Sequence, residues 1–307
     1  VGYYVDDLPS FAELYRRVWS PSASKAFVRF LGARYPVIRD LNAAWGTSYA
    51  SYDALVADKP DPQPSSGAQT AQTMLRDFKL FARETVARYV QLTASIVREE
   101  DPGHLVFSPR LEAGRGLVDA APYLDLFAPF DAVAVTVHPA DVTAGLSPAE
   151  LAMLELVYAS SGRPVIATGL SVPARDSGLY ATASSESPSW ESFTRSVGTQ
   201  ESRATQAYNV LASLYNMPFV IGAHWESWRD ADGDDKRREN LGLVKKDGKR
   251  YRELTQALTA FNARVYRSRG APLAAAPPAA GPDARKAAAT AVAAPVVDDV
   301  VDLRRKD

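Results

Sequence analysis

Short apolar runs rich in β-branched residues alternate with longer segments of helical periodicity along most of this chain. After an opening run, four more runs follow, at residues 104 to 109, 130 to 139, 163 to 169 and 217 to 225. The segments between and after them space apolar residues three and four positions apart, at 78 to 100, 147 to 160, 200 to 215 and 251 to 267. Strand alternating with helix predicts an α/β protein with a parallel sheet.

The residues that close each apolar run favour a barrel over an open sheet. Every run ends in polar or aromatic side chains, as expected where a site lies at the carboxyl ends of barrel strands. These side chains are Asp6 and Asp7, Arg110 and Glu112, His138, Ser171, and His224, Trp225 and Glu226. Five strands do not close an eight-stranded barrel, so we expect the first three strands to come from upstream sequence or from another chain.

The composition changes at residue 271. Residues 271 to 307 are rich in Ala and Pro and hold too little apolar area to fold alone, which predicts a disordered low-complexity tail. Docking of the last twelve residues on a protein partner stays open as an alternative. We therefore expect residues 1 to 270 to form the barrel part of the chain.

Charge and composition narrow the classes of function. The 35 Lys and Arg residues against 36 Asp and Glu residues give a net charge of -1, so no overall field draws the chain to nucleic acid or to an anionic membrane. The chain has no cysteine and only three histidines, which do not cluster, so no disulfide and no metal site is expected. Without a phosphate loop or a dinucleotide motif, no cofactor is expected either. No apolar run reaches the ~18 residues of a membrane span.

Several motifs resemble one family, in the order in which that family has them. Gly2-Tyr3-Tyr4-Val5-Asp6 and the segment from Phe30 to Leu55, which contains Trp45-Gly46-Thr47, are followed by FDAVAV, RPVIAT and GAHWESWRD. Residues 174 to 178 and 239 to 242 complete the set. The pattern is similar to the β-galactosidase and β-agarase-like members of the retaining glycoside hydrolases of clan A. The resemblance covers residues 1 to about 267 and implies a (β/α)8 TIM barrel, of which this chain supplies strands 4 to 8.

The resemblance also implies where the catalytic carboxyl groups belong. Retaining hydrolysis needs two of them about 5 Å apart, one as acid/base and one as nucleophile. The family has glutamates at the ends of the fourth and seventh strands, where this chain has Leu8 and Gly169. His138 stands where the family often has a tyrosine. Because neither Leu8 nor Gly169 can transfer a proton or attack, the resemblance predicts a non-hydrolytic pseudoenzyme that binds saccharide or serves as a structural subunit.

An active β-glycosidase on a galactose-containing polysaccharide, with relocated carboxylates, is the alternative. The fallback carboxylates are Glu112, Glu226 and Asp7. Side chains alternate along a strand, so Asp7 is expected to point away from the site if Leu8 points into it. Relatives that digest polysaccharides are typically exported, so the resemblance leans towards a secreted or cell-envelope protein.

Six residues are candidates for sugar contacts. The aromatic candidates are Trp225, Trp228 and Tyr4, and the polar candidates are Arg110, His138 and His224. Aromatic faces stack on the apolar side of pyranose rings, and the polar groups can donate hydrogen bonds to hydroxyls. Each also has a structural interpretation, since strand aromatics are commonly core and charged side chains are commonly paired.

Overall fold

Five parallel strands coincide with the apolar runs of the sequence, and β4 extends one residue beyond its run. A computed structural model describes residues 2–62, 67–139, 145–179, 196–232, 238–268 and 271–275 of the 307-residue chain. The strands are β1 (Gly2–Tyr4), β2 (Leu105–Phe107), β3 (Val133–Thr136), β4 (Val165–Leu170) and β5 (Val220–Trp225). The strand positions and the parallel pairing predicted from the sequence are therefore confirmed.

The five strands form a curved parallel sheet in chain order. β1 pairs with β2, and β3, β4 and β5 pair in succession. Isolated parallel bridges from Phe107 to Ala132 and from Leu111 to Val135 join β2 to β3. In a flat sheet β1 and β5 would lie roughly 19 Å apart, four spacings of about 4.8 Å. Instead Tyr4 Oη of β1 lies 2.8 Å from Nδ1 of His224 in β5, so the sheet curls towards a barrel.

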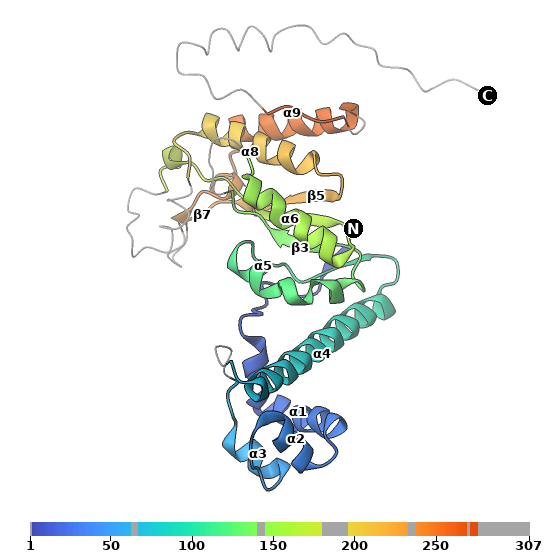
Figure 1. Cartoon of the computed structure of the whole chain (residues 1–307). Helices are drawn as coiled ribbons and strands as arrows, with labels where there is room; N and C mark the ends of the chain where they lie inside the picture. The colour runs from blue at the N-terminus through green and yellow to red at the C-terminus, as the bar shows by residue number, and fades with distance from the viewer. Residues whose placement is uncertain are drawn as a thin grey trace, which may run out of the picture.

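Helices cover the outer face of this sheet (Figure 1). They are α4 (Gln69–Glu100), α5 (Arg115–Ala120), η2 (Ala121–Phe127), α6 (Pro148–Ser161), α8 (Gln200–Tyr215) and α9 (Arg252–Ser268). The main core packs α4, α5, η2, α6 and α8 against the outward valines of the strands, and α9 packs against α8. Phe107, Ala132, Ala134 and Ile166 line the inner face beside Tyr4. The helix predicted at 200 to 215 matches α8, and α4 begins at Gln69, ahead of the predicted start at Phe78.

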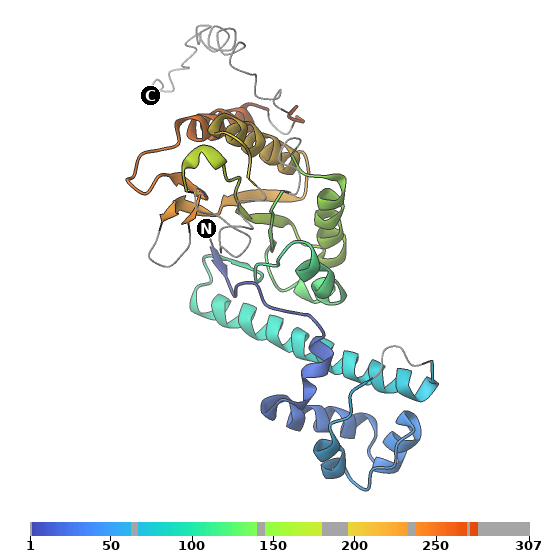
Figure 2. The same ribbon diagram turned by 90° about the vertical axis from the view of Figure 1, so that its left-hand side faces the viewer.

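The early start of α4 is explained by a small helical unit at its far end from the sheet (Figures 1 and 2). The unit contains η1 (Leu14–Trp19), α1 (Pro21–Arg34), α2 (Ile38–Trp45) and α3 (Tyr52–Asp58). Its core includes Phe27, Leu31, Leu41, Trp45 and Phe78. Buried Asp77 of α4 accepts hydrogen bonds from Tyr35 Oη at 2.7 Å and from Trp45 Nε1 at 2.8 Å. The first turns of α4 therefore pack against this unit rather than against the sheet.

Short elements follow β4 and β5 at the carboxyl edge of the sheet. They are η3 (Arg175–Ser177), β6 (Ser227–Arg229), β7 (Ala231–Asp232), β8 (Arg238–Glu239) and β9 (Gly242–Val244). None of the helices in the described ranges has both the length and the apolar character needed to cross a membrane.

The first residues of the predicted tail pack against the helices. Leu273 is buried beside Tyr208 of α8 and Phe261 of α9, and its amide donates to Asn216 Oδ1 at 2.8 Å. The packed chain therefore reaches Leu273. Residues 276 to 307 lie outside the described residues, so the disordered tail stays a prediction.

Candidate functional site

Arg110 joins two carboxylates at the carboxyl ends of β1, β2 and β5. Its Nε and Nη2 donate to Oδ1 and Oδ2 of Asp7, both at 2.8 Å. Its Nη1 lies 3.8 Å from Oε2 of Glu226, the residue that follows β5. We call Asp7, Arg110 and Glu226 the strand-end cluster. Three residues far apart in the sequence thus meet where a barrel site is expected.

Side-chain alternation would turn Asp7 away only if Leu8 pointed into the site, and the backbone at Leu8 does not keep the extended conformation that this argument needs. Asp7 forms a parallel bridge with Arg110, which extends the pairing of β1 and β2. The next residue, Leu8, has a φ of 47°, in the left-handed region that non-glycine residues rarely adopt. The chain leaves the extended conformation there, so alternation no longer applies. Asp7 lies in the cluster, and the Leu8 side chain is 46% exposed.

The charges of the cluster fix the protonation of Asp7. The Arg110 guanidinium hydrogen-bonds this carboxyl and holds its pKa below the usual range, because both the hydrogen bonds and the positive charge favour the ionised form. Asp7 in turn raises the pKa of Arg110. Burial raises the pKa of Tyr4, so this phenol also stays protonated at neutral pH.

Gly169 lies next to the cluster, at a register shift near the end of β4. Its φ is 65°, and a Cβ at this position would lie 3.2 Å from Oε2 of Glu226 and 3.5 Å from Cβ of Thr136. The Glu226 carboxylate therefore fills the space into which a side chain at residue 169 would project. The carboxylate of Glu226, which follows β5, thus lies beside residue 169 of β4, where the chain has no carboxylate of its own.

A buried network behind the cluster was missed by the sequence analysis. The carboxylate of Asp230 accepts hydrogen bonds from Gly242 N at 2.7 Å, Tyr251 Oη at 2.5 Å and Asn240 Nδ2 at 3.2 Å. Burial, followed by this carboxylate, raises the pKa of Tyr251. Asn240 Oδ1 also accepts from Ala174 N at 2.9 Å. The network thereby ties the loop after β5 to the loop after β4.

Arg203 of α8 completes this network. Its guanidinium donates to the carbonyl oxygens of Val172, at 2.5 Å, and of Asn240 and Gly242, at 3.1 and 2.9 Å. It also lies over the ring of Tyr251, 4.9 Å from the centroid. We call Asp230, Asn240, Tyr251 and Arg203 the support network. The sequence analysis missed this network because its residues lie far apart in the sequence, although residues 239 to 242 belong to a motif that the resemblance singled out.

The two predicted tryptophan platforms lie in different surroundings. Trp225 packs against the support network, because its Nε1 donates to Leu241 O at 2.7 Å and the Arg203 guanidinium lies 5.8 Å from its ring. Trp228 of β6 is 72% exposed. Of the two, Trp228 has the face that is open to a ligand.

Glu112 and His138 are not in the strand-end cluster. Glu112 is exposed and lies against Gly116 of α5. Within the described residues, no hydrogen bond or ion pair joins it to the cluster. His138 lines a cavity of about 20 Å³ with Glu150 and Met153 of α6. The structure thus unites Asp7, Arg110 and Glu226, and it joins Tyr4 to His224 separately.

A family model described as beta-galactosidase (Glyco_hydro_42) matches residues 10–167, just over half of the chain. The chain belongs to this glycoside hydrolase family. It is 24% identical over 257 residues to Beta-agarase B and 27% identical over 254 residues to Beta-agarase A, both from Vibrio sp. (strain JT0107). These matches cover 80% of the chain but only 24% and 23% of the relatives. The chain therefore spans about a quarter of the length of these curated relatives.

Solved structures agree with the family at the level of the fold. The structure of an exo-beta-agarase shares 23% identity and a TM-score of 0.65, over 88% of this chain and 36% of that chain. At this identity the likeness shows the fold alone. The predicted glycoside hydrolase resemblance is confirmed, while the numbering of the strands within a barrel and the loss of the catalytic glutamates stay predictions.

Proposed function

We propose that this member of the family binds a saccharide at the carboxyl ends of its strands and does not hydrolyse it. In this proposal β1 to β5 are the fourth to eighth strands of a barrel, and Leu8 and Gly169 stand at the acid/base and nucleophile positions. The relatives are named beta-agarase, and the matching family model is described as beta-galactosidase. Agar and galactoside oligosaccharides are therefore the first ligands to test.

The observation that carries this proposal is the pairing of Asp7 with Arg110. A general acid must keep its proton near the working pH, which requires a raised pKa. Asp7 is the carboxyl group nearest in sequence to Leu8, and Arg110 lowers its pKa instead. At neutral pH Asp7 is ionised and has no proton to give to a leaving oxygen.

The position of Glu226 favours a second candidate, an active glycosidase. Its Oε2 lies 3.2 Å from where a Cβ of residue 169 would be, so it could attack an anomeric carbon from β5 instead of β4. Such a nucleophile needs an acid about 5 Å away. Asp7 is ionised, and Glu112 lies against Gly116 of α5. We favour binding without hydrolysis because, among the described residues, neither Asp7 nor Glu112 supplies this acid.

The same surface supplies contacts for sugar hydroxyls. Arg110 offers donors, and the carboxylates of Asp7 and Glu226 offer acceptors, all at partly exposed side chains. The exposed face of Trp228 is suited to the apolar side of a pyranose ring. Exposed ion pairs contribute little to stability, so these groups can exchange partners for a ligand at low cost.

Calorimetric titration with neutral agar and galactan oligosaccharides tests the proposal. The wild-type protein should bind at least one of them, and Trp228→Ala should weaken that binding about tenfold through the lost stacking area. Tyr266→Ala is the matched control, since Tyr266 is 86% exposed on α9. Absence of binding by the wild-type protein would contradict the proposal and favour a structural subunit.

A further inference from the structure

Arg110 and Glu226 face each other across a gap that no hydrogen bond closes. Nη1 of Arg110 lies 3.8 Å from Oε2 of Glu226, which exceeds the roughly 2.7–3.2 Å of an N–H···O hydrogen bond. Among the described residues, this ion pair is the only polar contact of the Glu226 side chain. The two side chains are 26% and 33% exposed, so a ligand can reach both.

Asp7 fixes the direction of the Arg110 guanidinium. Its carboxylate accepts hydrogen bonds from Nε and Nη2, both at 2.8 Å, and binding at two points holds a guanidinium in one orientation. The backbone of Arg110 is held as well, because its carbonyl oxygen accepts from Leu8 N at 3.1 Å and its N–H donates to Asp6 O at 3.3 Å. Nη1 therefore stands at the edge of the gap, and its N–H groups are not used by Asp7.

The carboxylate of Glu226 is placed from the opposite side of the gap. The backbone N–H of Glu226 donates to Leu170 O at 2.9 Å, which anchors this residue to β4. Gly169 leaves room for the carboxylate, because a Cβ there would lie 3.2 Å from Oε2. Donor and acceptor are thus positioned by different strands without help from a ligand, which lowers the entropy cost of binding.

A hydroxyl group fits between this donor and this acceptor. An oxygen placed about 2.8 Å from both Nη1 and Oε2 can accept from the guanidinium while it donates to the carboxylate. A sulfate ester or a carboxylate has no proton to donate to Glu226, and an ammonium group has no lone pair for Arg110. The pair therefore favours a neutral hydroxyl over charged substituents.

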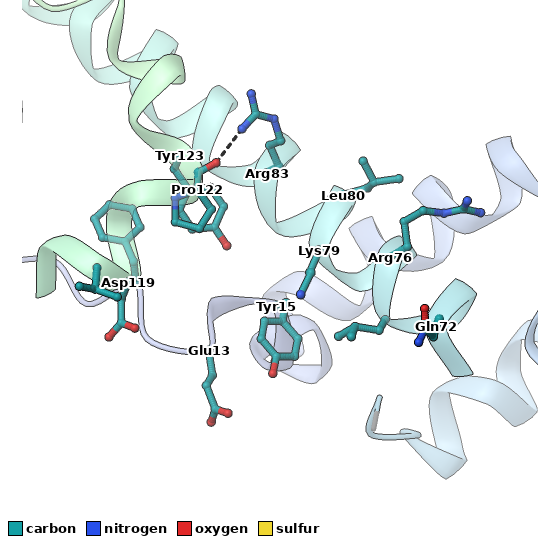
Figure 3. A pocket seen from close by; sticks show the side chains of 13 residues that line it. Glu13, Tyr15, Gln72, Arg76, Lys79, Leu80, Arg83, Asp119, Pro122 and Tyr123 are labelled. Carbon is teal, nitrogen blue, oxygen red and sulfur yellow. Dashed lines mark hydrogen bonds between the residues drawn. The ribbon is translucent and has the colours of Figure 1, made fainter. Parts of the chain in front are cut away.

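A groove of about 710 Å³ between α4, η1 and η2 differs from the strand ends, because its labelled cations do not converge (Figure 3). Arg76 points away from Lys79. Lys79 and Arg16 lie over the ring of Tyr15, 5.8 and 5.6 Å from its centroid. At the strand ends, by contrast, a donor and an acceptor meet across a gap of one atom.

We propose that Arg110 and Glu226 bind one sugar hydroxyl between them, and that Asp7 positions Arg110 for this contact. The inference rests on the proposed saccharide binding at the strand ends and adds its selectivity. One ring position of the sugar must carry an unsubstituted hydroxyl. A sugar with hydrogen, sulfate or a charged amino group at that position binds more weakly.

Titration calorimetry with a monodeoxy series tests this selectivity. The probes are a neutral agar tetrasaccharide, a neutral galactan tetrasaccharide and the forms of each that lack one hydroxyl, so that hydrogen bonds are lost without added bulk. One deoxy form should bind the wild-type protein at least about tenfold more weakly than its parent, because two charge-assisted hydrogen bonds are lost. If a parent binds and all of its deoxy forms bind equally well, the hydroxyl contact is wrong while saccharide binding stands. If neither parent binds, saccharide binding itself is wrong.

Glu226→Ala assigns the sensitive hydroxyl to the gap. This variant removes the acceptor, so the difference between the parent and the weak deoxy form should fall to about threefold or less. The control Glu155→Ala removes the same charge from an exposed position of α6 and should keep the tenfold difference. A tenfold difference that persists in Glu226→Ala would mean that another group binds the hydroxyl and would overturn the proposal.

Asp7→Ala tests the positioning role of Asp7. In this variant the guanidinium loses two hydrogen bonds and can turn towards Glu226, so the difference between parent and deoxy form should also fall to about threefold or less. Asp7→Asn keeps one acceptor for Arg110 and should retain more of the difference than Asp7→Ala. A full tenfold difference in Asp7→Ala would show that Asp7 does not position Arg110.

Discussion

The strand-end cluster combines two carboxylates with one arginine and the support network combines one carboxylate with one arginine, but the two regions differ in exposure. In the cluster the side chains of Asp7, Arg110 and Glu226 are 59%, 26% and 33% exposed. In the network Asp230 and Arg203 are 4% and 0% exposed. The buried support network is structural, because it holds the loops after β4 and β5 together. The strand-end cluster is exposed to solvent, and it has no carboxyl group at Leu8 or Gly169.

The energetics of burial explain why the two regions respond differently to change. A buried carboxylate with several donors cannot lose them without a large desolvation cost. An exposed ion pair is screened by water and contributes little. Substitutions in the network should therefore affect folding, and substitutions in the cluster should affect ligand binding.

Asp230→Ala should have the largest effect on stability. The variant leaves the donors of Gly242, Tyr251 and Asn240 without their shared acceptor, so the free energy of unfolding should fall by about 3–5 kcal/mol. Urea denaturation followed by circular dichroism measures it. Asp7→Ala, the exposed counterpart, should cost less than about 1 kcal/mol. If the two variants lost similar free energies of unfolding, the support network and the strand-end cluster would not differ in their contribution to stability.

Gly169→Ala should lower the free energy of unfolding by about 2 kcal/mol, more than the matched substitution Gly178→Ala lowers it. Both glycines have positive φ, a conformation that costs an alanine about 1–2 kcal/mol. Only at Gly169 would the new Cβ also contact Glu226, whose Oε2 would lie 3.2 Å away. Nothing lies within 4 Å of a Cβ at Gly178. Combining Gly169→Ala with Glu226→Ala should recover the difference. If the double variant stays as unstable as Gly169→Ala, then Glu226 does not fill that space.

Tyr251→Phe should lower stability by about 1 kcal/mol and change its dependence on alkaline pH. Burial and Asp230 raise the pKa of Tyr251, so its stabilising contribution is complete below the ordinary tyrosine pKa of about 10 and is lost as pH rises above it. Unfolding measured from pH 8 to 11 should show wild-type and variant stabilities converging as pH rises. A constant difference over this range would show that the Tyr251 hydroxyl does not titrate with unfolding.

Asp7→Asn should have the smallest effect on stability, within about 0.5 kcal/mol, because its partner Arg110 is at the surface. Arg110 lowers the pKa of Asp7. The contribution of this pair is therefore present above the ordinary aspartate pKa of about 4 and is lost as pH falls below it. Denaturation at pH 7 and pH 3 checks this. A large loss of stability in Asp7→Asn at pH 7 would mean that the strand-end cluster has a structural role.

The five parallel strands and the helices α4, α6, α8 and α9 could be predicted because their pattern is local, whereas α1, α2, α3 and α5 were not predicted. The spacing of apolar residues predicted α8 at its observed bounds. The first turns of α4 were missed because their apolar side chains face the helical unit rather than the sheet.

The side-chain contacts of the site depended on features that a sequence pattern does not carry. Asp7 was predicted to face away if Leu8 faced the site, and the left-handed backbone at Leu8 ends the extended conformation on which that alternation depends. The support network joins Arg203 to residues more than 30 positions away, so no periodicity reveals it. The roles of Trp225, Trp228 and His138 in sugar binding remain predictions.

Product analysis on the purified protein with neutral agar and galactan oligosaccharides tests the central claim most directly. Mass spectrometry of samples in which binding has been measured should show the intact oligosaccharide and no shorter products, in the wild-type protein and in Glu226→Gln alike. Shorter products that form with the wild-type protein and disappear with Glu226→Gln would contradict the account and identify Glu226 as a relocated nucleophile.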